Sequence, residues 1–75
     1  MIDTDRFVEL LGKYAKAENV QMDDVLFGEG LNISSVRFTE FLMDIEEDYN
    51  LDIDPGQLDV SIKTVGQLFQ HLNTL

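Results

Sequence analysis

Apolar residues recur at helical spacing in the first part of the chain. They fall at positions i, i+3, i+4, i+7 and i+8, which places them on one face of a helix; the set is Phe7, Leu10, Leu11, Tyr14 and Ala15. Asp3 and Thr4 are both able to cap the start of this helix. The pattern predicts an amphipathic helix that begins at residue 3 or 4 and ends near Glu18.

A second helical pattern begins at a pair of serines and runs from about Ser35 to Tyr49, with Asn50 as a plausible stop. Either serine can accept a hydrogen bond from an unpaired backbone N–H group, so each has an ordinary role as a helix cap. The positions expected to face inward are apolar: Phe38, Phe41, Leu42, Ile45 and Tyr49. The positions expected to face outward are charged: Arg37, Glu40, Asp44, Glu47 and Asp48.

The last part of the chain predicts two more helices. Thr64 and Gln67 have the spacing of a capping box, and the apolar pattern continues from there to the last residues. Asp54-Pro55 reads as a cap followed by proline at the first helical position, which predicts a short helix over Pro55 to Val60. Because no alternation typical of strands competes, the fold class is all-α, a bundle of three main helices plus one short helix. Its expected core comprises Phe7, Leu11, Phe38, Leu42, Ile45, Leu68 and Phe69.

Residues 19–33 form a long connection, which in a small domain indicates a functional loop or disorder. Its apolar content argues against disorder, because so much apolar surface is unfavourable in water: the residues are Val20, Met22, Val25, Leu26, Phe27, Leu31 and Ile33. We expect the connection to lie across the bundle and to anchor into it. A short turn is expected around Asp23 and Asp24, with bends at Gly28 and Gly30.

Length and charge narrow the classes of function. The chain has 75 residues, so we expect a single domain over residues 1–75 with a thin core and no deep catalytic cavity. Cysteine is absent, which suits a reducing compartment and means that any reactive thiol must be borrowed. The net charge of −10 disfavours nucleic-acid binding and favours basic protein partners. Without a long apolar run or a signal-peptide pattern, we expect a cytoplasmic monomer that is not bound to a membrane.

The order of these features resembles that of the acyl carrier protein family. The resemblance extends without a gap over residues 35–49 and on through residues 51–53, and it includes Gly30 before the serines and Thr64-Val65-Gly66-Gln67-Leu68 near the end. In that family the serine at the position of Ser35 carries 4′-phosphopantetheine derived from coenzyme A. The resemblance implies that a phosphopantetheinyl transferase modifies Ser35, and that the chain carries thioester-bound acyl intermediates and is not an enzyme.

Four features depart from the usual family pattern. The common motif is Asp-Ser-Leu, whereas this chain has Ser34-Ser35-Val36, so a carboxylate is missing before the modified serine. Gly30 is two residues farther from Ser35 than in many carriers, and Arg37 stands where an acidic residue is frequent. These differences bear on which transferase acts on the chain, and they leave Ser34 as the alternative attachment residue.

The outer face of the second helix is a candidate docking surface. Carboxylates recur there at steps of three and four residues, with Thr39 and Met43 close by; the acidic set is Glu40, Asp44, Glu47 and Asp48. Such a face suits partners with a basic groove, and its binding is expected to be weak and sensitive to salt. The partners that the resemblance implies are the transferase and acyl-transferring, ligase or synthase enzymes of fatty-acid, polyketide or specialised lipid pathways.

Three other interpretations stand beside the acyl carrier. Residues 48–59 superficially echo a calcium-binding loop, but Ile53 occupies the position that requires glycine, so we expect no metal site. The chain is alternatively an unmodified acidic interaction module of the same fold, or a carrier of aminoacyl or peptidyl groups.

His71, the only histidine, is interpreted as a solvent-facing residue near a helix end with no catalytic role.

Overall fold

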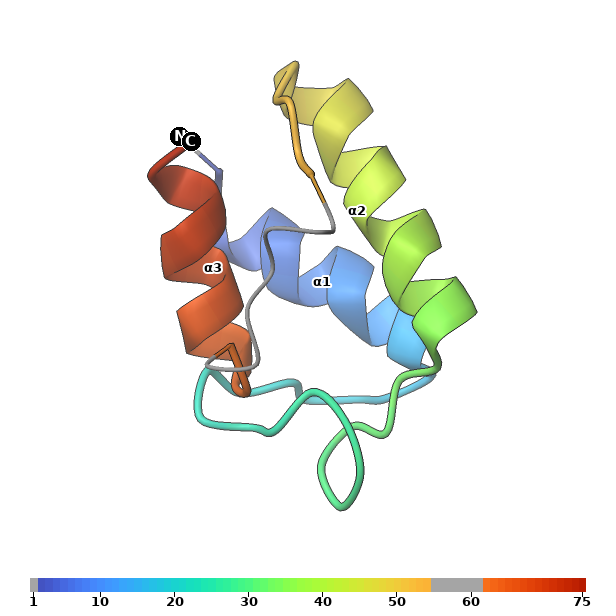
Figure 1. Ribbon diagram of the computed structural model, residues 1–75. Coiled ribbons are helices and arrows are strands. Elements are labelled where there is room, and N and C mark those ends of the chain that lie inside the picture. The colour runs from blue at the N-terminus through green and yellow to red at the C-terminus, as the bar shows by residue number, and fades with distance from the viewer. Residues whose placement is uncertain (1, 55–61) are drawn as a thin grey trace.

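The computed structural model describes residues 2–54 and 62–75, and three helices form its frame (Figure 1). They are α1 (Thr4–Ala15), α2 (Ser35–Tyr49) and α3 (Val65–Asn73). Over the described residues the only β-type pairing is a single antiparallel bridge between Val25 and Thr64, so the all-α prediction is confirmed. The short helix predicted over Pro55 to Val60 lies outside the described residues. None of the three helices is long and apolar enough to span a bilayer.

Helix α1 begins as the sequence predicts and ends earlier. The Asp3 side chain caps it by accepting a hydrogen bond from the Arg6 backbone N–H at 3.3 Å. It ends at Ala15 because Lys16 adopts a left-handed backbone (φ 56°), so the predicted end near Glu18 is wrong. The chain then folds back over Gly12, whose carbonyl accepts from the Ala17 N–H, and a Cβ at Gly12 would lie only 2.9 Å from the Ala17 carbonyl oxygen.

Helix α2 begins and ends, and helix α3 begins, where local sequence signals place them. Ser34 caps α2, and Asn50 ends it with a left-handed backbone (φ 53°) while its N–H donates to the Glu46 carbonyl. At α3, the Gln67 N–H donates to the Thr64 hydroxyl at 3.2 Å and the Gln67 side chain accepts from the Thr64 N–H at 3.0 Å. The predicted capping box is therefore confirmed.

Three aromatic rings organise the core. Phe7 on α1 contacts Phe41 on α2 and Phe69 on α3 edge to face, with ring centroids 5.4 and 5.0 Å apart. The largest fully buried side chains around them come from all three helices and one loop: Phe7, Phe41, Leu11, Leu26, Leu42, Ile45, Leu68, Leu72 and Val65. Phe38 and Phe69, both expected in the core, are only partly buried.

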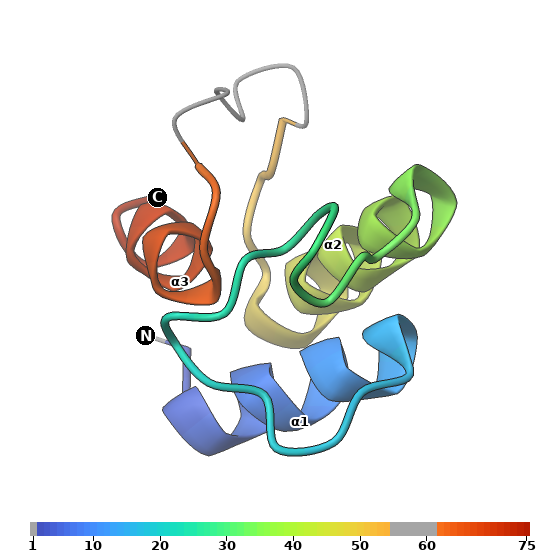
Figure 2. The same cartoon turned by 90° about the horizontal axis from the view of Figure 1, so that it is seen from below.

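The connection between α1 and α2 packs against the bundle, as predicted. Val20, Leu26 and Ile33 are buried, whereas Val25 and Phe27 remain 43% and 41% exposed. Seen from below, the connection crosses the end of the bundle and passes the start of α3 before it reaches α2 (Figure 2).

Backbone hydrogen bonds hold the connection to the segment that leads into α3. The Leu26 N–H donates to the Lys63 carbonyl at 2.8 Å, and the Val65 N–H donates to the Asp24 carbonyl at 2.9 Å. These bonds satisfy backbone groups that would otherwise be buried unpaired. They fix the loop that presents the two serines.

Candidate attachment site at the start of α2

The two serines at the start of α2 have different local roles. Ser34 is the N-cap, and its hydroxyl accepts a hydrogen bond from the Arg37 backbone N–H at 3.2 Å. Ser35 is the first residue of the helix and is exposed, and no described residue forms a hydrogen bond with its hydroxyl. The Ser34 hydroxyl is therefore engaged by the backbone, whereas the Ser35 hydroxyl is open to solvent and to modification.

The loop before the serines closes tightly upon itself. The Leu31 N–H donates to the Val25 carbonyl at 2.7 Å, and a Cβ built at Gly30 would lie 1.9 Å from the same carbonyl oxygen. Only glycine fits so close an approach. Asn32 follows with a left-handed backbone (φ 54°), and Ile33 then enters the core. This sequence of a glycine, an asparagine and an apolar anchor sets the direction in which the chain enters α2.

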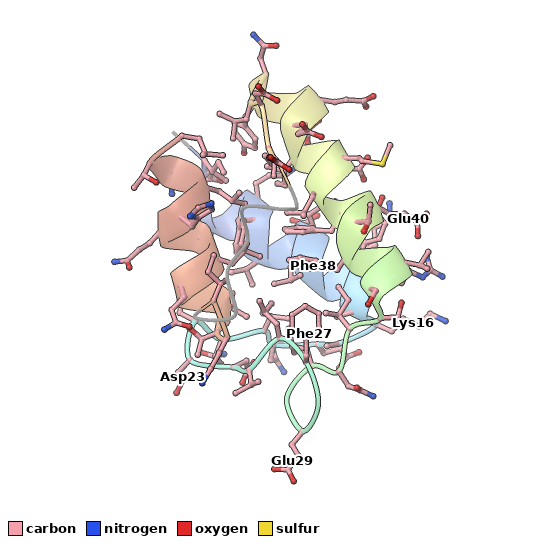
Figure 3. All side chains as sticks on the ribbon, in the orientation of Figure 1. Lys16, Asp23, Phe27, Glu29, Phe38 and Glu40 are labelled. Carbon is pink, nitrogen blue, oxygen red and sulfur yellow. The ribbon has the colours of Figure 1, made fainter. Side chains whose placement is uncertain are left out.

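An aromatic pair lies beside the attachment site. Phe38 follows Ser35 by one helical turn, and its ring contacts that of Phe27 edge to face, with centroids 5.2 Å apart (Figure 3). Phe38 is partly buried and Phe27 is 41% exposed. The sequence predicts both rings toward the interior; instead they pack against each other and form a partly exposed apolar surface.

The electrostatics at the start of α2 favour an anion. The first turn contains no acidic residue, and the unpaired N–H groups of a helix N-terminus carry a partial positive charge. A phosphate oxygen attached at Ser35 would be stabilised there by the same effect that draws phosphates to helix starts generally. The described residues thus fit a phosphodiester on Ser35, and the Ser34 hydroxyl supplies the cap without adding a repelling carboxylate.

Two of the four carboxylates predicted for docking contact α1. The Tyr14 hydroxyl donates to Asp44 Oδ2, and Arg6 Nη2 lies 2.9 Å from Asp48 Oδ2. The hydrogen bond to Asp44, followed by burial, raises the pKa of Tyr14, and the hydrogen bond and charge of Asp48 raise the pKa of Arg6. Asp44 is half-buried, so its predicted outward orientation is wrong. The reason is that α1 packs along this side of α2 and supplies a hydroxyl partner.

The remaining members of the predicted docking surface are exposed. Glu40, Met43, Glu47 and Thr39 all face solvent, and the Thr39 hydroxyl donates to the Ser35 carbonyl at 2.9 Å. Val36, which sequence reasoning left out of the surface, is 71% exposed, more than Met43 at 57%. The spacing of residues 36, 40, 43 and 47 is the signal that could have identified Val36, because these positions share one helix face.

No second chemical site accompanies the serines in the described part of the chain. His71, expected to face solvent, is half-buried in the last turn of α3. Among residues 2–54 and 62–75, no group of three or more histidine, aspartate or glutamate side chains is placed to hold a metal ion. Part of the calcium-like stretch, residues 55–59, lies outside this range.

A small helical bundle that presents an exposed serine at the start of a helix suits a carrier to which another group is attached. The sequence profile of the family described as "phosphopantetheine attachment site" matches residues 4–72, and the chain belongs to this family. No curated protein and no solved structure matches it. The chain is therefore a phosphopantetheine carrier protein, not an enzyme, and it works with modifying transferases and with synthase or ligase enzymes.

Proposed function

We propose that the chain is an acyl carrier protein that is modified on Ser35 and carries thioester-bound acyl groups between enzymes of fatty-acid, polyketide or specialised lipid biosynthesis. The observation that supports Ser35 is the division of roles between the serines: Ser34 is committed to the cap and Ser35 is exposed and unengaged. The acidic, cysteine-free composition fits a cytoplasmic monomer, because a net charge of −10 opposes self-association.

The chemistry assigned to Ser35 is that of an acceptor. Its oxygen forms a bond to one phosphorus of coenzyme A and loses its proton, while the pyrophosphate link breaks and the adenosine part leaves with the remaining phosphates. The transferase must supply the base, because no described residue is hydrogen-bonded to this hydroxyl. The chain has no cysteine, so the thiol that holds the cargo comes from the attached arm.

In this proposal the exposed face of α2 is where partner enzymes dock. Glu40, Met43, Glu47 and Thr39 are exposed there, and the face lies on the same helix as Ser35, so a docked partner lies close to the arm. Asp44 and Asp48 contribute charge from the edge beside α1, since Asp48 still has 40% of its side chain exposed. Binding through such exposed charges is expected to weaken as salt screens them.

Intact mass after incubation with coenzyme A and a transferase of broad carrier range tests the attachment site. We expect the wild-type chain to gain the mass of one phosphopantetheine group and the Ser35→Ala variant to gain none. The matched control is Ser34→Ala, which keeps the Ser35 hydroxyl and should still be modified. A gain that survives in Ser35→Ala and is lost in Ser34→Ala would move the site to Ser34. Bare serines in every variant would favour the unmodified interaction module.

A further inference from the structure

Arg37 occupies the third helical position of α2, where local stability favours a different residue. In α3 the equivalent position holds Gln67, whose side chain accepts hydrogen bonds from the Lys63 and Thr64 N–H groups at 2.7 and 3.0 Å. A glutamate or glutamine at position 37 would do the same for the serine cap of α2. A guanidinium has no acceptor atom, so α2 lacks the second half of the capping box that the chain builds at α3.

The charge of Arg37 is also unfavourable for α2. A cation near a helix N-terminus opposes the helix dipole, and α2 has neither an acidic residue in its first turn nor a basic residue in its last turn. Helix α1 has an arginine at the same position, Arg6, but its first turn also contains Asp5 and its last turn contains Lys13. The Arg6 guanidinium is moreover paired with Asp48 at 2.9 Å. Arg37 has neither an acidic neighbour in its turn nor so close a partner.

The contacts of Arg37 within the chain give little compensation. Among the described residues its only ion pair is with Glu40, with Nη1 and Oε1 3.9 Å apart, and the side chains are 47% and 49% exposed. An exposed pair at this distance contributes almost nothing to stability. The guanidinium therefore remains available to a carboxylate from another molecule.

The position of Arg37 relates it to the docking face proposed above. Val36 and Met43 supply exposed apolar surface on α2, and Glu40 is exposed on the same helix. Arg37 is also exposed and follows Ser35 by two residues, so it lies at the end of the helix where the arm would be attached. Charges at the rim of an interface act mainly on the rate of association and on the choice of partner. The face thus changes from positive near Ser35 to negative toward Glu47.

We propose that Arg37 determines which partners the carrier accepts, by pairing with an acidic side chain that the partner presents beside the entrance for the arm. The partner surface then has an apolar recess that receives Val36 and Met43. It is acidic where it faces the start of α2 and basic where it faces Glu47. Enzymes whose docking surface is basic throughout are rejected through repulsion at Arg37. This inference rests on the proposed function, because it assigns specificity to the same site.

The charge-reversed variant Arg37→Glu tests this role against Lys63→Glu, which makes the same change in net charge. Lys63 is exposed and lies before α3, and its hydrogen bonds to other described residues involve only its backbone groups. The probe is a phosphopantetheinyl transferase whose docking surface carries clustered lysine and arginine side chains. At low salt we expect kcat/KM to be about tenfold higher for Arg37→Glu than for wild type. This increase should disappear in about 0.5 M salt. At low salt, kcat/KM for Lys63→Glu should stay within about twofold of the wild-type value.

Thermal unfolding distinguishes this role from a structural one. Arg37→Glu completes the capping box and removes a cation that opposes the helix dipole, so its Tm should be higher than that of wild type by about 2 °C or more. If Arg37 instead stabilised the fold, the substitution would lower the Tm. Equal rates for the two variants, or a slower Arg37→Glu, overturn the assignment of specificity to Arg37 while leaving the carrier function intact. A failure of every chain to gain mass, wild type included, is instead a failure of the proposed function, and the specificity role falls with it.

Discussion

At the scale of single residues, the site depends on how two adjacent hydroxyl groups are used. A helix start leaves backbone N–H groups without partners, and one nearby oxygen satisfies one of them. Ser34 supplies that oxygen, and it stands at the position where the usual family motif has aspartate. Ser35 is thereby left exposed.

The capping role of Ser34 predicts separate effects on stability and on modification. We expect Ser34→Ala to lower the free energy of unfolding by about 1 kcal/mol and to leave the mass gain at Ser35 in place. Ser34→Asp should retain the cap and the stability. Urea unfolding of both variants measures the first effect, and intact mass measures the second. Loss of modification in Ser34→Ala with its fold intact would contradict this separation of roles.

Gly30 is the residue whose replacement should most disturb the loop that presents the serines. A methyl group there would overlap the Val25 carbonyl oxygen, at 1.9 Å, so the backbone must move. We expect Gly30→Ala to cost about 2 kcal/mol or more. The control is Gly28→Ala, which has open space around it but a left-handed backbone (φ 70°), and should cost about 1 kcal/mol. Urea unfolding that ranks the two variants in the opposite order would refute this account of the loop.

At the scale of elements, polar contacts with α1 distinguish one side of α2 from the rest of that helix. Tyr14 engages Asp44 and Arg6 engages Asp48, so this edge contributes to the contact between the two helices, while Val36 and Met43 on another face of α2 are exposed. The sequence predicts the whole charged face as outward, because its helical spacing does not reveal which neighbouring helix covers one edge.

The contact between Tyr14 and Asp44 predicts a dependence of stability on alkaline pH. The pKa of Tyr14 is raised above its ordinary value of 10.0 in the folded chain, mainly by its hydrogen bond to Asp44. Because the folded state favours the protonated phenol, the stabilisation is complete below pH 10 and is lost as the pH rises through the folded pKa. We expect Tyr14→Phe to be less stable than wild type at pH 7 and to lose less stability between pH 9 and pH 11.

Thermal unfolding of the two chains across that range measures the difference. Tyr49→Phe is the control, because Tyr49 is the other tyrosine and its hydroxyl has no hydrogen bond to the described residues. Parallel curves for wild type and Tyr14→Phe would contradict the role of this hydroxyl.

The helices themselves were largely predictable from the sequence, because their signals are local. The apolar spacing of residues 35–49, the stop at Asn50 and the Thr64–Gln67 box all appear in the structure. The end of α1 was not predictable, since it depends on the close approach of Ala17 to Gly12. A contact of this kind is set by packing and has no distinct mark in the residue pattern.

At the scale of the whole molecule, the least predictable feature is how the long connection is fixed. Its buried anchors Val20, Leu26 and Ile33 were expected from their apolarity. The pairing of residues 24–26 with residues 63–65 joins segments far apart in the sequence, and neither segment has the alternation of a strand. The exposed contact between Phe27 and Phe38 follows from the same path of the loop.

Ser35, the candidate attachment residue, is also where the sequence was most informative. The resemblance selected Ser35, and the structure shows that this serine is exposed and that its neighbour is the cap. For the face proposed for docking, the exposure of Glu40, Met43 and Glu47 was predicted, whereas the exposed Val36 was left out and Asp44 contacts α1. The site thus combines a local feature, which the sequence encodes, with a surface that depends on helix packing.

The most direct test of the carrier assignment is to locate the arm on the native protein by peptide fragmentation mass spectrometry. Cleavage after Lys16 and Arg37 yields a peptide that contains both serines, and fragmentation between them assigns the modification. We predict one phosphopantetheine group on Ser35 and an unmodified Ser34. An arm on Ser34, or two bare serines in protein isolated while its partner enzymes are active, would contradict the account.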